Sequence, residues 1–293
     1  MRTQEKLIYT NERGESIEFS PASSYHVNFK DVTGLSDVRN AIYSTNSMGQ
    51  DGDTYLGYRI ESRDIDIVGY IKERDKQAAQ NLRRKLNRIL NPQYEATLTY
   101  VFGDFRRVIG CKIAPIFKRK PIFEQFTVSL SCLNPFWREE TETREDIATW
   151  IGGFEFPVPD GLELYDGWEI GYRQPSLIVN VYNSGDVKSG IRIEFRAIGA
   201  VTNPVLLNVD TREFIKLNIS LVAGDVLTVS TGYGEKAVKL NRGGTITDAF
   251  RYLDVDSSYL QIAVGDNLFR YSADANAENL EVSIYHNNLY LGV

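Results

Sequence analysis

Apolar and polar residues alternate one by one along much of this chain, and this pattern most constrains its fold. Between residues 191 and 197, Ile191, Ile193 and Phe195 alternate with Arg192 and Glu194. A period of two places one kind of residue on each face of a β-strand. The same alternation recurs near residues 6–9, 16–19, 25–29, 64–71, 97–102, 106–113, 123–132, 177–181, 215–221, 226–230 and 235–240. Antiparallel sheets with one buried face show this pattern, so the chain is predicted to be mainly β.

Length and composition agree with a mainly β chain of two domains. The 293 residues are enough for two separate cores, because a domain commonly has about 100 to 150 residues. Seventeen Tyr and fourteen Phe stand against two Met and two Cys. Aromatic residues suit the half-buried faces of sheets, which again favours strands over helices.

A run of charged residues divides the chain. Residues 138–146 contain Arg, Glu, Asp and Thr but no large apolar side chain. Such a run is typical of a domain junction or an exposed edge, and an acidic strip that docks another protein is the alternative. We therefore predict a first domain over residues 1–138, a β-sandwich or barrel with one helix. Residues 139–293 are predicted to form a two-sheet β-sandwich of the jelly-roll kind.

One segment has a helical period. From about Arg74 to Leu90, apolar residues recur every three to four positions, and Asn91-Pro92 ends the pattern. The apolar positions are Ala78, Leu82, Leu86 and Ile89, and Leu82 and Leu86 are expected to be buried against the sheet. The other faces carry Lys76, Arg83, Arg84, Lys85 and Arg88. A basic helix face is compatible with nucleic-acid binding, but a solvated or subunit-facing side is favoured in an acidic chain.

Glycine-containing segments mark the predicted turns and one arm. Gly14 is expected to close a hairpin at Asn11-Glu12-Arg13-Gly14, because glycine accepts a positive φ. Residues 46–57 are polar and contain glycine, and they are predicted to form a long exposed loop or arm. Gly265-Asp266-Asn267 is predicted to be the turn between strands at residues 260–264 and 268–271.

Charge and hydropathy disfavour two classes of partner. The formal net charge of -6 argues against a surface that binds phosphate backbones. No apolar stretch approaches the roughly 20 residues that span a bilayer, and residues 1–6 lack the apolar core of a signal peptide. We expect neither a membrane partner nor specific nucleic-acid binding. Cys111 and Cys132 are in the inward register of their strands, so buried free thiols are favoured over a disulfide.

Side chains that carry chemistry lack the neighbours that catalysis or metal binding requires. His26 and His286 have no nucleophile signature nearby, and we expect interface or strand-end roles for them. Asp166 and Glu169 are three residues apart, which does not establish the carboxylate separation that glycoside hydrolysis needs. Asp51-Gly52-Asp53 lacks the spaced ligands and closing Glu of a calcium loop. No enzymatic activity, metal site or cofactor is predicted.

Aromatic residues gather near the start of the second domain. They are Trp150, Tyr165, Trp168 and Tyr172. Jelly-roll sandwiches commonly serve as lectins, and an aromatic ring can stack on a pyranose. Core or rim packing is the ordinary role of such residues. Binding of host cell-surface glycans is therefore the alternative function.

Two groups of residues resemble one protein family. Leu-Asn-Arg-Ile-Leu-Asn-Pro ends the predicted helix at residues 86–92, and Val-Ser-Leu-Ser-Cys-Leu-Asn-Pro-Phe-Trp closes the first domain at residues 128–137. A Leu-x-x-x-x-Gly-x-Asn run at residues 260–267 is followed by a final Tyr-Leu-Gly-Val. In this order the motifs resemble those of the distal tail proteins of long, flexible-tailed bacteriophages.

The resemblance implies a phage or prophage structural protein of the virion tail tip, made in the host cytoplasm. It implies a hexameric ring in which the first domain forms a belt, with a galectin-like second domain directed towards host-recognition proteins. It also implies that the chain end can return towards the first domain. The implied partners are further copies of the chain, the major tail tube protein, a tail-associated hub or lysin protein, and a receptor-binding protein. Candidate subunit contacts are His26, Asn46, Asp51, Asp53 and Arg84. One ring or two stacked rings both fit the sequence.

Overall fold

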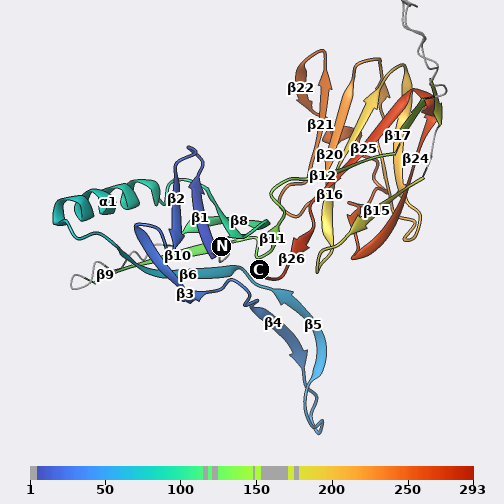
Figure 1. Cartoon of the computed structure of the whole chain (residues 1–293). Helices are drawn as coiled ribbons and strands as arrows, with labels where there is room; N and C mark the ends of the chain where they lie inside the picture. Colours follow the sequence, from blue (N-terminus) through green and yellow to red (C-terminus); the bar gives the residue numbers. More distant parts are fainter. Residues whose placement is uncertain (1–4, 115–117, 121–124, 148, 153–170, 175–177) are drawn as a thin grey trace, which may run out of the picture. The chain divides into compact units, whose positions relative to one another are not determined.

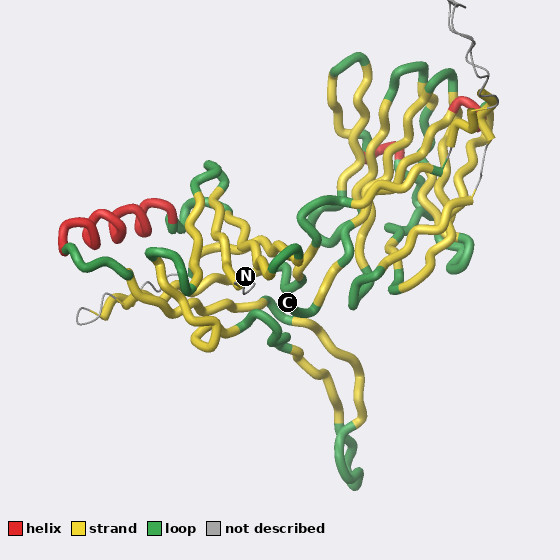
Figure 2. The backbone as a smooth tube through the Cα atoms, in the orientation of Figure 1, coloured by secondary structure: helices red, strands yellow, loops and turns green. Residues whose placement is uncertain are grey.

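The structure is a computed structural model, and it describes residues 5–114, 118–120, 125–147, 149–152, 171–174 and 178–293. The chain forms two compact units, Met1–Glu140 with Leu289–Val293 and Thr141–Asn288. Strands dominate both units, and a single α-helix occurs among the described residues (Figures 1 and 2). The prediction of a mainly β chain is confirmed.

The first unit is built around a closed seven-stranded barrel. Its strands are β1 (Glu5–Asn11), β2 (Ser16–Ser20), β3 (Tyr25–Thr33), β6 (Arg63–Ile71), β7 (Ala96–Phe102), β8 (Phe105–Ile113) and β10 (Gln125–Cys132). They follow one another around the barrel in the order β8-β7-β1-β2-β3-β6-β10, and pairing of β8 with β10 closes it. Closure leaves few exposed strand edges, which otherwise invite aggregation.

Alternation along the barrel strands produces the core of the first unit. Leu7 and Tyr9 on β1, Ile65 and Ile67 on β6, and Leu130 on β10 are all fully buried. These inward positions are those that the period of two predicts. The predicted hairpin at Gly14 is also present, with φ +79 at that glycine and β1 paired to β2.

Further elements extend the barrel unit. They are a hairpin of β4 (Asn40–Thr45) and β5 (Thr54–Ile60), the strand β9 (Lys118–Lys120) beside β10, the strand β11 (Trp137–Arg138) beside β8, and the strand β26 (Leu289–Tyr290) beside β11. Residues Leu289–Val293 therefore belong to the first unit although the sequence of the second unit precedes them. Tyr290 pairs with Trp137 across β26 and β11.

Helix α1 (Lys76–Ile89) is shorter at both ends than the predicted span of residues 74–90. Asp75 caps its first turn, since the Asp75 Oδ2 atom accepts a hydrogen bond of 2.7 Å from the Ala78 amide. Leu86 and Ile89 are buried against the barrel. The equal burial expected of Leu82 was wrong, because Leu82 is only partly buried and packs at the edge of the core.

The second unit contains two antiparallel sheets. One is β12 (Thr143–Asp146), β25 (Leu280–His286), β16 (Ser189–Ala197), β20 (Val226–Ser230), β21 (Ala237–Arg242) and β22 (Thr245–Asp248), with β23 (Gln261–Ile262) beside β16. The other is β15 (Ile178–Asn183), β24 (Gly265–Ala275), β17 (Val201–Asn208) and β18 (Phe214–Lys216), with β19 (Ser220–Leu221) beside β17. The short helices η1 (Phe250–Tyr252) and η2 (Ala277–Asn279) connect strands, and β13 (Thr149–Gly152) pairs with β14 (Gly171–Gln174).

One apolar core lies between these two sheets. Ile193 and Phe195 of β16 share it with Leu206 of β17 and Phe269 and Tyr271 of β24. Side chains from both sheets in one core define a β-sandwich. The charged run at residues 138–146 contains the boundary between the two units, at Glu140 and Thr141, and β12 lies at the edge of its sheet.

The predicted turn at Gly265-Asp266-Asn267 is wrong. These residues are the first three of β24 and pair with β15. Asn267 closes the preceding bend with its side chain: Oδ1 accepts from the Ala263 amide at 2.8 Å, and Nδ2 donates to the Ala263 carbonyl at 2.8 Å. An asparagine that caps a bend from within a strand has the same sequence signature as a turn residue. Val264, the last residue of the predicted strand at residues 260–264, lies in this bend and is 55% exposed.

Candidate functional site

The strongest candidate site in the described residues is an arm that projects from the barrel of the first unit (Figure 1). It consists of β4 and β5 and the loop that joins them, residues 40–60. The expected exposed arm is present, but the expectation of a loop over residues 46–57 was wrong at one end. Thr54 to Gly57 belong to β5 and pair with Tyr43 to Thr45 of β4. The sequence did not reveal this strand, because an arm without a buried face shows no alternation of apolar and polar residues.

Large apolar side chains of the arm are open to solvent. Six of them have exposed fractions from 50% upward: Ile42, Tyr43, Met48, Tyr55, Leu56 and Tyr58. Ile42 is directly opposite Tyr58, and Ser44 is directly opposite Tyr55, so Ile42, Tyr55 and Tyr58 share one face of the hairpin. We call these three residues the apolar arm face. Contiguous exposed apolar surface commonly marks a protein interface.

Three of the predicted contact residues lie together at the tip of the arm. Asn46, Asp51 and Asp53 are all exposed in the loop between β4 and β5. Asp53 also stabilises the loop, because its Oδ2 atom accepts a hydrogen bond of 2.9 Å from the Ser44 hydroxyl. A second hydrogen bond of 2.9 Å joins Gln50 Nε2 to Thr54 Oγ1. The tip is therefore an ordered polar loop beyond the apolar arm face.

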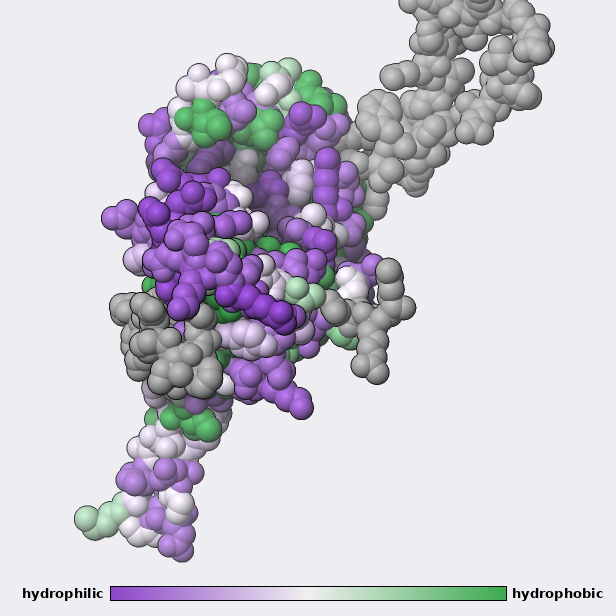
Figure 3. All heavy atoms as spheres, turned by 60° about the vertical axis from the view of Figure 1, so that its left-hand side comes forward, coloured by the Kyte–Doolittle hydropathy of each residue, from purple (hydrophilic) through white to green (hydrophobic). Residues whose placement is uncertain are grey.

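The other two predicted contact residues lie on the barrel and the helix. His26 on β3 stacks against Tyr70 of β6, with ring centroids 4.4 Å apart, and its Nδ1 atom is 2.8 Å from the Pro21 carbonyl oxygen. Arg84 is exposed on α1. Helix side chains contribute to a strongly hydrophilic surface on this side of the first unit (Figure 3). The structure does not bring His26 or Arg84 to the arm.

Two of the predicted glycan-binding residues are on the antiparallel strand pair β13–β14. Trp150 is on β13 and is opposite Arg173, while Tyr172 is on β14 and is opposite Ile151. Tyr165 and Trp168 lie outside the described residues, as do Asp166 and Glu169. The glycan site stays a prediction.

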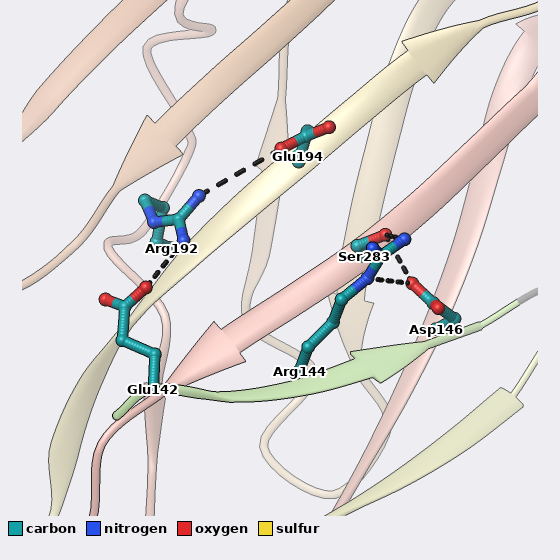
Figure 4. Close-up of polar contacts among 6 residues, drawn as sticks. All are labelled: Glu142, Arg144, Asp146, Arg192, Glu194 and Ser283. Carbon is teal, nitrogen blue, oxygen red and sulfur yellow. Dashed lines mark hydrogen bonds and ion pairs between the residues drawn. The ribbon is translucent and has the colours of Figure 1, made fainter. Parts of the chain in front are cut away.

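The outer face of the β12–β25–β16 sheet carries a network of charged side chains (Figure 4). Arg192 contacts Glu142 at 2.5 Å, and Arg144 contacts Asp146 at 2.8 Å. The hydroxyl of Ser283 donates to Asp146 at 2.5 Å. The Arg192 guanidinium also lies 3.8 Å from the centroid of the Tyr285 ring. Paired charges and a covered aromatic ring indicate a stabilised sheet surface, since a sugar would need an open ring face.

Two further features of the described chain bear on function. Within the described ranges, no group of three or more His, Cys, Asp or Glu residues is arranged to hold a metal ion. None of the described helices is long and apolar enough to cross a membrane. The arm thus remains the best candidate site among the described residues.

Models of two protein families match most of this chain. A family model described as a phage tail protein RIFT-related domain matches residues 4–132. A second, described as the C-terminal domain of a siphovirus-type tail component, matches residues 184–290. The chain belongs to the siphophage distal tail protein family. The predicted resemblance is confirmed.

Solved structures of phage tail and baseplate proteins share the fold over nearly the whole chain. The crystal structure of phage SPP1 Dit (gp 19.1), described as a paradigm of the hub adsorption apparatus in phages that infect Gram-positive bacteria, has a TM-score of 0.64 and 13% identity. The match covers 97% of this chain and 98% of that one. The phage P2 baseplate in its activated conformation with Ca has a TM-score of 0.54 at 13% identity, covering 98% of each chain. No curated protein sequence matches the chain.

Sequence reasoning missed the apolar arm face. It identified the arm from its polar and glycine residues and chose the tip residues as contacts. The available signal was the group Ile42, Tyr43, Tyr55, Leu56 and Tyr58, which flanks the polar loop on both sides. Aromatic residues are enriched at protein interfaces, so their presence beside an exposed loop was informative.

Proposed function

We propose that this protein is a structural component of the tail tip of a phage or prophage, where six copies form a hub ring. In this proposal the ring joins the major tail tube protein to a tail-associated hub or lysin protein and to a receptor-binding protein. The chain is made in the host cytoplasm, has no enzymatic activity and needs no cofactor. The apolar arm face is the single observation that carries the proposal.

The arm supports ring formation because an isolated two-stranded hairpin is only marginally stable in water. Ile42, Tyr55 and Tyr58 are each at least 60% exposed, so nothing in the described chain covers the apolar arm face. A neighbouring copy would cover it and stabilise the hairpin at the same time. An arm on one subunit that reaches a different surface of the next makes a heterologous contact, and such contacts form a ring when the rotation from subunit to subunit closes.

The experiment measures the mass of the purified full chain in solution by light scattering, and it compares two single variants of the arm. Tyr58→Ser removes an aromatic residue from the apolar arm face, whereas Tyr43→Ser makes the same change opposite Gly57 on the other face. We expect a hexamer for the unchanged chain and for Tyr43→Ser. Tyr58→Ser is expected to shift the mass towards the 33.2 kDa monomer.

A monomeric unchanged chain at all accessible concentrations would refute the ring. Equal masses for the two variants would instead show that the apolar arm face is not the subunit contact. Glycan binding by a monomeric chain would favour the carbohydrate-binding alternative.

A further inference from the structure

Arg63 is a buried arginine at the point where the arm rejoins the barrel. Arg63 is 2% exposed and is the first residue of β6. The guanidinium donates to backbone carbonyls from three parts of the chain. Nη1 donates to Gly34 at 2.9 Å and to Leu35 at 2.7 Å, Nε donates to Pro135 at 2.9 Å, and Nη2 donates to Leu291.

The Gly34–Leu35 turn belongs to the segment that joins β3 to the arm, and we call this segment the first leg of the arm. Gly34 has φ +85, and a Cβ atom there would lie 2.0 Å from the Asp64 carbonyl oxygen, so only glycine fits. The Leu35 carbonyl also accepts a hydrogen bond of 2.9 Å from Trp137 Nε1. Arg63 itself ends the second leg, the short segment that joins β5 of the arm to β6. Both legs of the arm are therefore held by one guanidinium.

The segment Leu289–Val293, which we call the returning segment, completes this arrangement. Tyr290 donates from its hydroxyl to Glu139 at 2.8 Å, and the Arg107 guanidinium lies 3.9 Å from the centroid of its ring. The Ser36 hydroxyl donates to the Val293 carbonyl oxygen at 2.8 Å. The returning segment thus contacts the Gly34–Ser36 turn both directly and through Arg63.

A buried guanidinium needs its acceptors, because an unsatisfied buried charged group is costly. If the returning segment leaves, Nη2 of Arg63 loses the Leu291 carbonyl and the site opens to water. The turn at Gly34–Leu35 then loses part of its support, and the arm that follows loses its fixed direction. Local stability of the arm legs therefore depends on a segment that is synthesised after the second unit.

We propose that Arg63 is a positioning residue that couples docking of the returning segment to the placement of the arm. Chains in which the segment has docked present the arm to a neighbouring copy, whereas chains in which it has not docked do not assemble. The claim about assembly rests on the ring proposed above. The coupling between the returning segment and the arm concerns a single chain and does not depend on the ring.

Gly292→Val in the full chain tests the coupling without a change at Arg63. Even a Cβ atom at residue 292 would lie 3.0 Å from the Ser36 Cα atom, so the larger valine displaces the returning segment. Gly110→Val is the matched control, because a Cβ atom there meets nothing within 4 Å. Hydrogen exchange is followed in peptides spanning residues 34–45 and 54–63, at dilutions where light scattering shows both variants as monomers.

We expect exchange in these arm peptides to be at least about tenfold faster in Gly292→Val than in Gly110→Val. Exchange in α1 and β16 should be the same in both. Unchanged exchange of the arm peptides in Gly292→Val, with the segment 289–293 itself exchanging freely, would overturn the coupling. Because both chains are monomers in this measurement, the result is independent of whether a ring forms.

Arg63→Lys is the second variant, with Arg39→Lys as its control. Lysine keeps the charge, but its ammonium group lacks the planar set of N–H donors with which the guanidinium binds several carbonyl oxygens at once. Arg39 is also at the base of the arm, but it is an exposed residue paired with Asp64 at 2.9 Å. Faster arm exchange in Arg63→Lys alone supports the coupling, and equal exchange in both variants contradicts it.

Should Gly292→Val lose protection throughout the first unit, a chain without residues 289–293 decides the matter. A synthetic peptide of residues 287–293 is added to it, with the Gly292→Val peptide as control. Restoration of arm protection by the first peptide alone supports the proposal. Absence of any difference between the peptides refutes it.

Discussion

Asp225 and Arg242 form a two-pronged ion pair at the end of the β20–β21 hairpin. Arg242 Nε lies 3.0 Å from each carboxylate oxygen of Asp225, and Nη2 lies 2.6 Å from Oδ2. The Asp225 side chain is 2% exposed while that of Arg242 is 50% exposed. Asp225 Oδ2 also accepts from the Val222 amide at 2.9 Å. The carboxylate therefore anchors both the hairpin and the bend before it.

Asp225→Asn should reduce the free energy of unfolding of the second unit by about 1 to 3 kcal/mol, because hydrogen bonds to a charged acceptor are lost. Denaturant titration of the full chain measures this change. Arg251→Ala, at an exposed arginine of the same unit, is the control and should change stability by less than about 0.5 kcal/mol. Equal midpoints for the two variants would contradict a structural role for the pair.

Stability should also depend on pH through Asp225. The hydrogen bonds from the Arg242 side chain hold the pKa of this carboxyl below its ordinary value. The unfolded chain binds the proton at its ordinary pKa of about 3.9, above the folded pKa, so the unfolded state holds more protons between the two values. The stabilisation is fully present above the unfolded pKa and is lost as the pH falls through the folded pKa. The difference in Tm between the unchanged chain and Asp225→Asn should thus be constant near neutral pH and shrink in acid.

Leu86→Ala should reduce the free energy of unfolding of the first unit by about 2 to 5 kcal/mol, because the Leu86 side chain on the inner face of α1 is fully buried. Leu82→Ala should cost less, since Leu82 is only partly buried. Arg84→Ala on the exposed side of the same helix is the control. A denaturation midpoint for Leu86→Ala equal to that of Arg84→Ala would show that the helix does not pack as described.

Both cysteines should be free thiols that react only after unfolding. Cys111 is 5% exposed and Cys132 is fully buried. Burial raises the pKa of the Cys132 thiol to about 12 and raises the pKa of Cys111 as well, so neither forms a thiolate near neutral pH. Titration with a thiol reagent should detect neither cysteine in the native chain and both in the denatured, non-reduced chain. A missing thiol after denaturation would indicate a disulfide.

Asn267→Ala should destabilise the second unit by about 1 to 3 kcal/mol, because it leaves buried backbone groups without partners. Asn267 is 3% exposed, and its Nδ2 atom donates to the carbonyls of Ala263 and Gly265 at 2.8 and 3.0 Å. Asn241→Ala on β21 is the control, since Asn241 is only partly buried. A thermal melt in which both variants unfold together would show that the bend does not depend on this side chain.

Much of the fold followed from local patterns, and the errors have identifiable causes. Inward positions such as Ile193 and Phe195 were predicted correctly, because apolar residues recur at every second position along a strand with one solvent-exposed face. The turn at Gly265–Asn267 was misplaced because a side chain, rather than the backbone sequence, closes the bend. The strand at residues 54–57 was missed because neither face of the arm is buried within the chain.

The candidate site was predicted in part. Asn46, Asp51 and Asp53 were placed on an exposed arm from their polar and glycine-rich neighbourhood, and the structure places them at its tip. The apolar arm face was missed, because register between β4 and β5 is needed to show that Ile42, Tyr55 and Tyr58 lie together. The structure does not bring His26 or Arg84 to the arm. The sequence could not show this, because it does not place residues of different elements relative to one another.

The sequence by itself determined the class of fold, the single helix and the inward face of most strands, because each depends on residues close together along the chain. Tertiary structure alone decided that β8 pairs with β10 to close a barrel. It also placed residues 289–293 in the first unit, a return of the chain end that the family resemblance had implied and no local pattern predicts. It also decided that Arg63 holds carbonyls of residues as distant as Gly34 and Leu291. These contacts join segments far apart in sequence, and the packing of the whole chain selects them from many pairings with similar local patterns.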